Sequence, residues 1–483
     1  MTVKRNYIDG EWVDSAAAPI VDRNPSDLED VVGSYAAADA AQTRRAIEAA
    51  RAAFPAWSRS SIQERADLLD AVGGKILARA QEIGRLLARE EGKTLKEGVG
   101  ETVRAAHVFK FHAGQALRIA GALLDSPRKG ISVLVQREPV GVIGIITPWN
   151  FPIAIPAWKI APALAYGNCV VFKPASLVPG CAHAIAELLA ESGCPRGVFN
   201  LVVGSGREVG DVLVAAPEVD AISFTGSVET GRGLAARAVG SMKKIQLEMG
   251  GKNPLIVLDD ADLDNAVECA IQGAFYSTGQ RCTATSRVIV TPGIYARFRA
   301  ALVEKTKALV VGDALDEKTH IGPAVDATQL KTDLDYILVG QKEGARLVAG
   351  GDRAPAPKNG FYIAPTIFED VHNQMRIARE EIFGPVVSIL RAKDDEEALA
   401  IANDTPFGLS AGICTTSLKR ADHFRRNAQV GLAMINAPTA GVDYHVPFGG
   451  VKASSYGPRE QGVNAVEFYT RIKTVYTNVN IGG

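Results

Sequence analysis

Between residues 140 and 240, short runs rich in β-branched residues alternate with segments of helical periodicity. The runs are GVIGIIT, NCVVFKP, FNLVVG and AISFTGS, and the helical segments are 179–192, 207–214 and 229–239. Apolar runs of this kind are typical of strands buried on both faces, and helices between them indicate βαβ units. The pattern predicts an α/β fold with a mostly parallel sheet, and such sheets bind ligands beyond the carboxyl ends of their strands.

Other segments extend this pattern on both sides. Asp9-Gly10 stands between two short runs and predicts a hairpin over residues 6–13. Helical periodicity covers 38–54, 62–91 and 101–117, strand-like alternation covers 132–137, and a second α/β region follows Gly250-Gly251. The tail AVEFYTRIKTVYTNV alternates as a strand without an evident partner in the chain. We expect it to pair with another subunit, because an unpaired strand edge favours association.

Length and composition narrow the class of protein. The chain has 483 residues, 47% of them hydrophobic, so two or three lobes are expected. The 53 basic and 54 acidic residues give a net charge of -1, which disfavours a nucleic-acid partner. No apolar signal segment opens the chain, and prolines and Lys159 interrupt the most apolar stretch, so no membrane span is expected. Six scattered cysteines indicate a reduced, cytoplasmic protein, and no histidine–cysteine cluster has metal-site spacing.

The stretch STGQRCTATSR, residues 277–287, places Cys282 just past a helical segment. Free cysteines are mostly small buried residues, and the other five stand in or beside apolar strand or helix patterns. Cys282 differs because Thr278-Gly279 signals the end of the helix and its neighbours are polar. The cation of Arg281 favours the thiolate, which is the nucleophilic form, so Cys282 is a candidate nucleophile.

Two further polar residues follow strand-like runs. Glu248 ends such a run in QLEMGGKNP, and Asn150 follows GVIGIIT in TPWNFP, between two prolines that stiffen the backbone. Alone, Glu248 fits an exposed strand-end carboxylate and Asn150 fits a turn residue. The seven histidines stand in no diagnostic context, and the motifs G-x-S-x-G and H-E-x-x-H are absent.

Together, LEMGGKNP, GQRCTA and TPWNFP closely resemble the aldehyde dehydrogenase superfamily, and the resemblance runs from YIDGEWV to FGGVKASSYGPREQG and the C-terminal strand. It implies the fold of that family. A Rossmann-like cofactor domain would cover 1–119 and 140–249, an α/β catalytic domain 250–463, and a small β arm 120–139 and 464–483. It also implies that the arm joins subunits into a homodimer or homotetramer.

The resemblance implies a role for each candidate. Cys282 matches the nucleophile that attacks an aldehyde carbonyl, giving a thiohemiacetal whose hydride passes to a nicotinamide and a thioester that water hydrolyses. Glu248 matches the general base for that water, and Asn150 matches the side-chain donor of the oxyanion hole beside the backbone N–H of Cys282. Lys159 matches a lysine proposed to relay protons, and a snorkelling surface lysine is the alternative.

For the cofactor, two glycine-rich stretches compete. VVGSGREVG fails the G-x-G-x-x-G pattern because its third glycine is one place late, at Gly210. FTGSVETG follows a strand and opens a helix, lacks the lysine of a P-loop, and matches the family's dinucleotide element. The expected cofactor residues are Thr147, Trp149, Lys173, Ser176, Gly226, Ser227, Gly231, Gly250, Glu381 and Phe383, with a core position as the alternative for Phe383.

The position of Ser176 bears on the choice of cofactor. Relatives restricted to NAD tend to carry a glutamate there, which accepts the ribose 2′-OH and repels a 2′-phosphate. Serine removes this repulsion and Lys173 adds a positive charge. We therefore expect NADP or NAD as the cofactor.

Arg281 bears on the substrate, because most relatives carry a small or uncharged residue just before the nucleophile. A guanidinium there suits the carboxylate or phosphate of an acidic aldehyde, and a structural salt bridge is the alternative. GQRCTA is similar to two subgroups, which oxidise α-ketoglutaric semialdehyde (2,5-dioxopentanoate) or glyceraldehyde-3-phosphate without phosphorylation, and residues 443–462 favour the first. Succinic semialdehyde also fits. Phe151, Trp158 and His445 are further expected substrate residues, although some acid-semialdehyde enzymes place an arginine at the position of Trp158.

Two other classes stay open. A catalytically silent relative, used for binding or structure, would share the fold without turnover, although Cys282, Glu248 and Asn150 are all present. In a CoA-acylating relative, a thiol replaces water as the acyl acceptor, and the presence of Glu248 favours hydrolysis instead.

Overall fold

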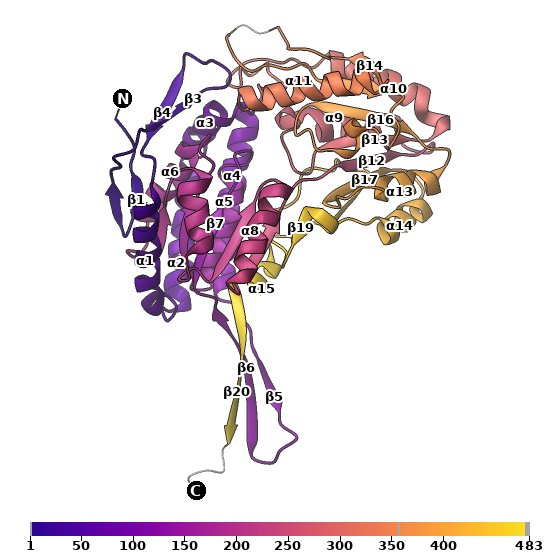
Figure 1. Ribbon diagram of the computed structural model, residues 1–483. Helices are drawn as coiled ribbons and strands as arrows, with labels where there is room; N and C mark the ends of the chain where they lie inside the picture. The colour runs from indigo at the N-terminus through magenta and orange to yellow at the C-terminus, as the bar shows by residue number, and fades with distance from the viewer. Residues whose placement is uncertain (1, 356–357, 479–483) are drawn as a thin grey trace.

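A computed structural model describes residues 2–355 and 358–478 (Figure 1). Its largest sheet has eight strands in the order β19-β11-β10-β7-β8-β9-β1-β2. The parallel strands are β11 (Lys244–Glu248), β10 (Ala221–Thr225), β7 (Val142–Ile146), β8 (Cys169–Lys173) and β9 (Phe199–Leu201). Antiparallel strands close both edges: β19 (Ser455–Tyr456), β1 (Asn6–Ile8) and β2 (Glu11–Val13). The predicted parallel sheet and the N-terminal hairpin are therefore confirmed.

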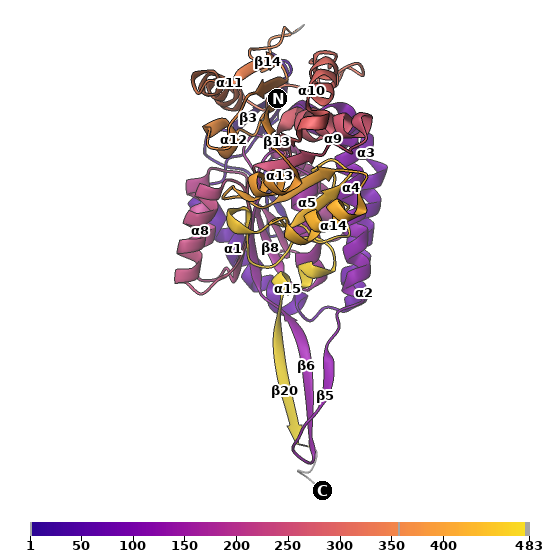
Figure 2. The same ribbon diagram turned by 90° about the vertical axis from the view of Figure 1, so that its right-hand side faces the viewer.

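Helices cover both faces of this sheet (Figure 2). One face carries α1 (Ala40–Trp57), α7 (Asp211–Ala215) and α8 (Val228–Gly240). The other carries α2 (Ile62–Ala78), α3 (Ala80–Glu91), α4 (Leu95–Ala116), α5 (Ala154–Ala165) and α6 (Pro179–Glu191). Because α8 starts just beyond β10, its N-terminus lies at the carboxyl end of the sheet, where a ligand site is expected.

Several helices differ from the sequence prediction. Residues 62–91 form two helices, because Arg79 leaves the helical region with φ -105° and ψ 18°. Residues 207–214 form a π-helical turn, Gly206–Gly210, followed by α7. α4 begins at Leu95, earlier than predicted, behind a capping box of Thr94 and Glu97. α5 escaped prediction because it is apolar and buried on every face, which leaves no amphipathic period.

The second sheet has seven strands in the order β14-β15-β16-β13-β12-β17-β18, parallel except at β14. They are β14 (Arg346–Ala349), β15 (Thr366–Glu369), β16 (Val386–Arg391), β13 (Thr285–Val290), β12 (Asn253–Val257), β17 (Ser410–Cys414) and β18 (Leu432–Ile435). Its helices are α9 (Leu263–Phe275), α10 (Pro292–Lys307), α11 (Ala327–Lys342), α12 (Arg376–Arg379), α13 (Asp395–Asn403) and α14 (Leu418–Asn427). The chain then crosses back, because β19 pairs with β11 of the first sheet.

Two small antiparallel sheets complete the described structure. β3 (Ile20–Arg23) pairs with β4 (Val31–Tyr35), and β5 (Ala122–Asp125), β6 (Ile131–Pro139) and β20 (Thr470–Asn478) form an arm that projects from the body (Figure 1). β20 pairs along its length with β6, so the expectation that the C-terminal strand lacks a partner in its own chain is wrong. The start of the predicted strand is instead helical, as α15 (Val466–Tyr469). Residues 479–483 of the predicted arm lie outside the described residues.

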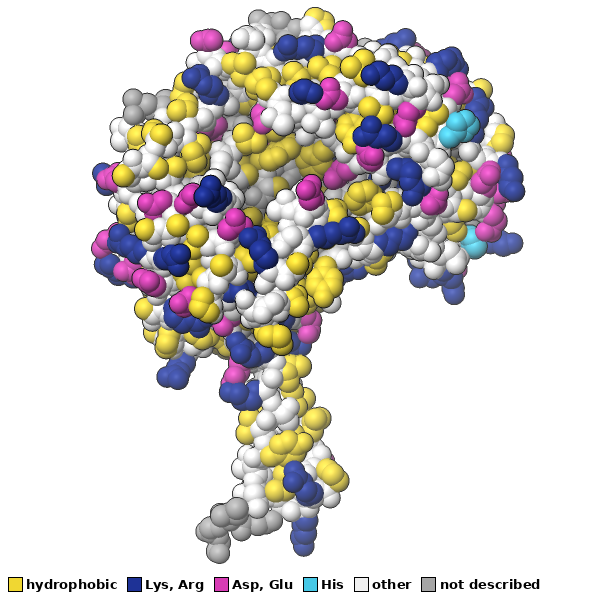
Figure 3. Space-filling model, in the orientation of Figure 1, with side chains coloured by type: hydrophobic (Ala, Val, Ile, Leu, Met, Phe, Trp, Pro, Cys, Tyr) yellow, Lys and Arg dark blue, Asp and Glu magenta, His cyan; other side chains and the backbone are white. Residues whose placement is uncertain are grey.

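One face of the molecule is hollowed between the parts built on the two large sheets, and hydrophobic side chains gather around the hollow (Figure 3). Among the described residues, no helix is both long and apolar enough to cross a membrane.

Candidate active site

Two cavities meet at Cys282. One, of about 420 Å³, follows the carboxyl ends of β7, β8, β10 and β11, as the parallel sheet predicts. The other, of about 300 Å³, is lined by α4, α5 and the loop 277–283. Cys282 lines both, so its thiol lies where two ligands would meet.

The loop before Cys282 has an unusual backbone. α9 ends at Phe275, and Ser277 and Thr278 then adopt left-handed φ values of 52° and 56°. Such values cost energy in residues with a β carbon, and they persist where the surroundings hold the backbone in place. Cys282 is partly exposed, whereas the other five cysteines are buried, as their sequence contexts predict.

The pKa of the Cys282 thiol is raised in spite of the neighbouring Arg281. Burial, and then the carboxylates of Glu381 and Glu248, raise the pKa of Cys282 to about 12. The Arg281 guanidinium donates to backbone carbonyls in the last turn of α9, where the helix dipole favours a cation. The expected activation of the thiol by Arg281 is therefore wrong, because desolvation outweighs the neighbouring charge.

Asn150 follows β7 and is buried. Its Nδ2 donates to the backbone carbonyl of Gln280 at 3.0 Å, across 130 residues of sequence. An amide nitrogen carries two hydrogens, so one remains for an oxygen atom held beside Cys282. This proximity is what an oxyanion-hole donor requires.

Glu248 ends β11 and is buried, so the interpretation as an exposed strand-end carboxylate is wrong. Ser455 Oγ donates to its Oε2, and Gly449 leaves it room, since a β carbon there would lie 2.6 Å from Oε1. Burial and the charge of Glu460 raise the pKa of Glu248 well above its ordinary value. A carboxylate of raised pKa is a stronger base, which suits proton abstraction near neutral pH.

Lys159 is fully buried on α5, so the interpretation as a snorkelling surface lysine is also wrong. Its Nζ donates to Ser223 Oγ at 2.8 Å and to Glu460 Oε1. Glu460 in turn is close enough to Glu248 to raise its pKa. Lys159 and Glu460 therefore form a buried ion pair whose charges both act on Glu248.

The larger cavity collects most of the expected cofactor residues: Thr147, Trp149, Lys173, Gly226, Ser227, Gly250, Glu381 and Phe383. The buried hydroxyl of Thr147 has no hydrogen-bond partner within the described chain. Ser227 is the N-cap of α8, where unpaired N–H groups and the helix dipole favour a phosphate. This side of the site has the chemistry that a dinucleotide needs.

Ser176 and Gly231 do not line this cavity. Ser176 Oγ donates to the carbonyl of Gly204 at 3.2 Å. Gly231 packs against Met249, because a β carbon there would lie 2.6 Å from the sulfur. The absence of a side chain at Gly231 thus allows α8 to pack closely against Met249, so Gly231 affects where the helix lies.

The loop around Glu381 forms another wall of the larger cavity. Glu381 Oε1 accepts the N–H of Gly251 at 2.9 Å, and burial raises the pKa of Glu381 to about 7. Phe383 has a φ of 64° and meets the Trp149 ring edge-on, with centroids 5.4 Å apart. Gln329 of α11, which sequence reasoning missed, donates to a backbone carbonyl of this loop at 3.0 Å. Phe383 is therefore held at the cavity wall and not in the core.

The smaller cavity is lined by Phe151, Trp158 and Arg281, as expected. His445 is exposed, and its ring packs against Tyr444 instead of lining this cavity. Sequence reasoning missed four charged residues at or near the start of α4 that line it: Lys93, Glu97, Glu101 and Arg104. The last three recur at helical spacing, and this polar stripe was the available signal.

Two arginines in the smaller cavity are not satisfied. The Nε atoms of Arg104 and Arg281 are buried without a hydrogen-bond partner among the described residues, and so is the Nε1 of Trp158. Arg104 Nη2 donates to the amide oxygen of Gln461, at 3.2 Å. Arginine stays charged when buried. Glu97 and Glu101 line the same cavity, but neither forms an ion pair with Arg104 or Arg281 among the described residues, so both guanidinium groups keep an unused donor.

Comparison with known proteins identifies the family of this chain. A model of the aldehyde dehydrogenase family matches residues 12–475. An α-ketoglutaric semialdehyde dehydrogenase of Bacillus subtilis is 46% identical over 474 residues, covering 98% of this chain and 97% of the relative. A betaine aldehyde dehydrogenase of Rhizobium etli is 41% identical, with 98% and 97% covered. The crystal structure of a Staphylococcus aureus betaine aldehyde dehydrogenase in complex with NAD+ matches with a TM-score of 0.96 at 36% identity, covering 99% and 95% of the two chains. The chain therefore belongs to the aldehyde dehydrogenase family and is an oxidoreductase that acts on aldehydes.

Proposed function

We propose that the enzyme oxidises an aldehyde with a carboxylate at its far end, of the α-ketoglutaric semialdehyde type, to the corresponding acid, with NAD or NADP as cofactor. The observation that supports this most is that the Nε atoms of Arg104 and Arg281, in the cavity beside Cys282, are buried without a hydrogen-bond partner among the described residues. A substrate carboxylate would supply their missing acceptor, and a buried donor without a partner is costly. The name of the Bacillus subtilis relative agrees with this substrate.

Cys282, Asn150 and Glu248 divide the chemistry in this proposal. The Cys282 thiolate adds to the aldehyde carbon, and Asn150 Nδ2 with the backbone N–H of Cys282 stabilises the alkoxide. A nicotinamide dinucleotide bound in the larger cavity supplies the hydride acceptor. Glu248 then takes a proton from the water that attacks the thioester, which releases the acid and the thiolate. The contacts of Lys159 and Glu460 support a path for that proton.

The residues of the larger cavity fit a dinucleotide. The N-terminus of α8, behind Gly226 and Ser227, suits the pyrophosphate, and Glu381 suits ribose hydroxyls. Lys173 supplies a positive charge, although burial lowers its pKa to about 8. NADP is proposed beside NAD, because Ser176 places no negative charge against a 2′-phosphate. Residues 1–119 and 140–249 would form the cofactor domain and 250–463 the catalytic domain, with β19 of the latter completing the sheet of the former.

The proposed acidic substrate and betaine aldehyde carry opposite charges, so the cavity should discriminate between them. Betaine aldehyde carries a quaternary ammonium, which Arg104 and Arg281 would repel. Succinic semialdehyde and glyceraldehyde-3-phosphate end in anions and are the second candidates.

Cofactor reduction, followed by its near-ultraviolet absorbance, tests the proposal with acidic semialdehydes, betaine aldehyde and propanal. Arg104→Leu should lower kcat/KM for the acidic semialdehydes by roughly 10- to 100-fold, the value of one charged hydrogen bond, and leave propanal within about twofold. Lys96→Leu, at an exposed position of the same helix, is the matched control and should change neither.

Equal losses for acidic substrates and propanal would remove Arg104 from substrate recognition. Failure of every aldehyde to reduce NAD or NADP would favour the silent-relative hypothesis.

We also propose that the arm joins copies of the chain into a homodimer or homotetramer. The arm exposes large hydrophobic side chains, which are Leu123, Leu124, Leu134, Ile472 and Tyr476, and exposed apolar patches are typical of interfaces. Six free cysteines support a reducing compartment, the cytoplasm. Light scattering after size-exclusion chromatography measures the assembly, and a monomer would contradict this part of the proposal.

A further inference from the structure

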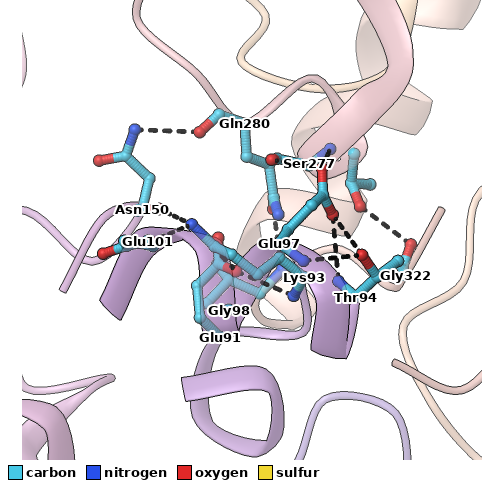
Figure 4. A network of polar contacts seen from close by, with 12 residues as sticks. Glu91, Lys93, Thr94, Glu97, Gly98, Glu101, Asn150, Ser277, Gln280 and Gly322 are labelled. Atoms are coloured by element: carbon cyan, nitrogen blue, oxygen red, sulfur yellow. Dashed lines mark hydrogen bonds and ion pairs between the residues drawn. The ribbon is translucent and has the colours of Figure 1, made fainter. Parts of the chain in front are cut away.

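Residues at the start of α4 connect the two segments that carry Asn150 and Cys282 (Figure 4). Lys93 is 1% exposed, and its Nζ donates to the backbone carbonyl of Asn150 at 2.6 Å and to Glu101 Oε2 at 2.7 Å. The same ammonium lies 3.8 Å from the ring centroid of Phe151. Lys93 therefore contacts both Asn150 and the residue that follows it.

Glu101 holds the next part of the same segment. Its Oε1 accepts the backbone N–H groups of Ile153 and Ala154, at 3.0 and 3.1 Å. These groups open α5, and the residue at its N-cap position makes no side-chain hydrogen bond to them. The carboxylate of Glu101 thus caps α5, and Lys93 links that carboxylate to Asn150.

Glu97 contacts the nucleophile loop from the same turn of α4. It forms a capping box with Thr94, and its Oε1 accepts the backbone N–H and the Oγ of Ser277, at 2.8 and 2.9 Å. Ser277 is one of the two left-handed residues that precede Cys282. One end of one helix therefore touches the backbone on both sides of the reacting centre.

Three charged residues of this network, Glu91, Lys93 and Glu101, are buried. Burial lowers the pKa of Lys93, but Glu101 and Glu91 more than reverse this, so the pKa is raised and the ammonium stays charged. Buried ion pairs contribute little stability compared with apolar packing of the same volume. The buried Lys93–Glu101 pair beside the reacting centre is therefore better explained by a role in positioning than by a contribution to stability.

We propose that Lys93 and Glu101 are positioning residues that set the place of the Asn150 amide relative to the Cys282 sulfur, with Glu97 tying the nucleophile loop to the same helical turn. The inference rests on the proposed oxyanion role of Asn150. Misplacing a catalytic group by about 1 Å costs about 10²-fold in rate, so the anchor of its backbone affects turnover.

Two reactions of the same thiol test this inference. Oxidation of propanal passes through an alkoxide, whereas alkylation of Cys282 by iodoacetamide displaces iodide and forms none. Lys93→Met and Glu101→Gln should lower kcat for propanal by roughly 10- to 100-fold, while the alkylation rate and the Kd of NAD stay within about twofold. Lys93→Arg should recover part of the loss, and Lys96→Met, at the exposed position, should change nothing.

Glu101→Gln keeps its size and one acceptor for the N–H groups of α5, so it tests the inference even where Lys93→Met fails to fold. Asn150→Ala is the reference and should lower kcat by about 10²- to 10³-fold. Lys93→Met added to Asn150→Ala should cause no further loss, because both act through one amide.

The possible failures are distinguishable. Full activity of Asn150→Ala would overturn its oxyanion role and this inference with it. An impaired Asn150→Ala beside fully active Lys93→Met and Glu101→Gln would overturn the inference alone. The inference alone would also be overturned if Lys93→Met slowed alkylation and oxidation equally. It would likewise be overturned if the losses in kcat of Lys93→Met and Asn150→Ala were fully additive in the double variant.

Discussion

The two cavities that meet at Cys282 are built in different ways. The larger lies along strand ends and a helix N-terminus, with Gly226 and Gly250 in its wall. The smaller lies beside α4 and α5, and its wall includes aromatic rings and the charged side chains of Arg104 and Arg281. Backbone geometry is kept by the fold, whereas side chains change one at a time. The shape of the larger cavity therefore depends mainly on the fold, whereas the binding properties of the smaller cavity can be changed by single substitutions.

Replacing the residue that the cavities share should have the largest effect. Cys282→Ala removes the nucleophile and should lower aldehyde oxidation by roughly 10³-fold or more, while the Kd of NAD measured by calorimetry stays within about twofold. A parallel loss of NAD binding would mean that the two cavities are not independent.

Glu248→Gln should separate the two half-reactions at this shared centre. The first turnover should survive as a burst of reduced cofactor, and the steady state should then be about 10²- to 10⁴-fold slower, because no base activates the water. Stopped-flow absorbance measures both phases. A normal steady-state rate would contradict the role of Glu248 as the base.

The raised pKa of Cys282 predicts a pH dependence. Only the thiolate reacts and the thiol is protonated below its pKa of about 12, so alkylation by iodoacetamide should accelerate about tenfold per pH unit across the neutral and mildly alkaline range. Peptide mass spectrometry identifies the labelled site, with Cys282→Ala as the control. A plateau near neutral pH would show that the charge of Arg281 outweighs burial after all.

The smallest effect is expected at Ser176, which follows β8 outside the lining of the larger cavity. Ser176→Glu adds a carboxylate where a 2′-phosphate is proposed to lie, and should shift the ratio of kcat/KM values about tenfold from NADP toward NAD. Ser176→Ala is the uncharged control, and the KM for aldehyde should not change in either variant. An unchanged cofactor ratio would remove Ser176 from the ribose site.

Much of the fold was predictable from local sequence patterns. The elements that the prediction missed were missed for physical reasons. The β-branched runs identified β7, β8, β9 and β10, because strands buried on both faces are apolar throughout. The same uniformity hid α5, in which every residue is buried. The break at Arg79 was invisible because the residues on both sides are good helix formers.

The two cavities also differ in how well their residues could be predicted from the sequence. The strand-end turns predicted most of the wall of the larger cavity from motifs alone. The charged residues of α4 were missed, because a polar stripe on a helix ordinarily faces water. Packing of α4 against α5 turned Glu101 and Arg104 toward the site instead.

The sequence by itself determined the α/β class with its parallel sheet, the family, and which residue types stand at the ends of strands. These depend on neighbouring residues, whose periodicity and turn chemistry can be read directly. Only the tertiary structure decided that Lys93 supports Asn150, that Arg281 bonds to α9 instead of activating the thiol, and that β20 pairs with β6. Those outcomes depend on burial and on contacts between residues far apart in the chain, where desolvation sets which charge interactions prevail.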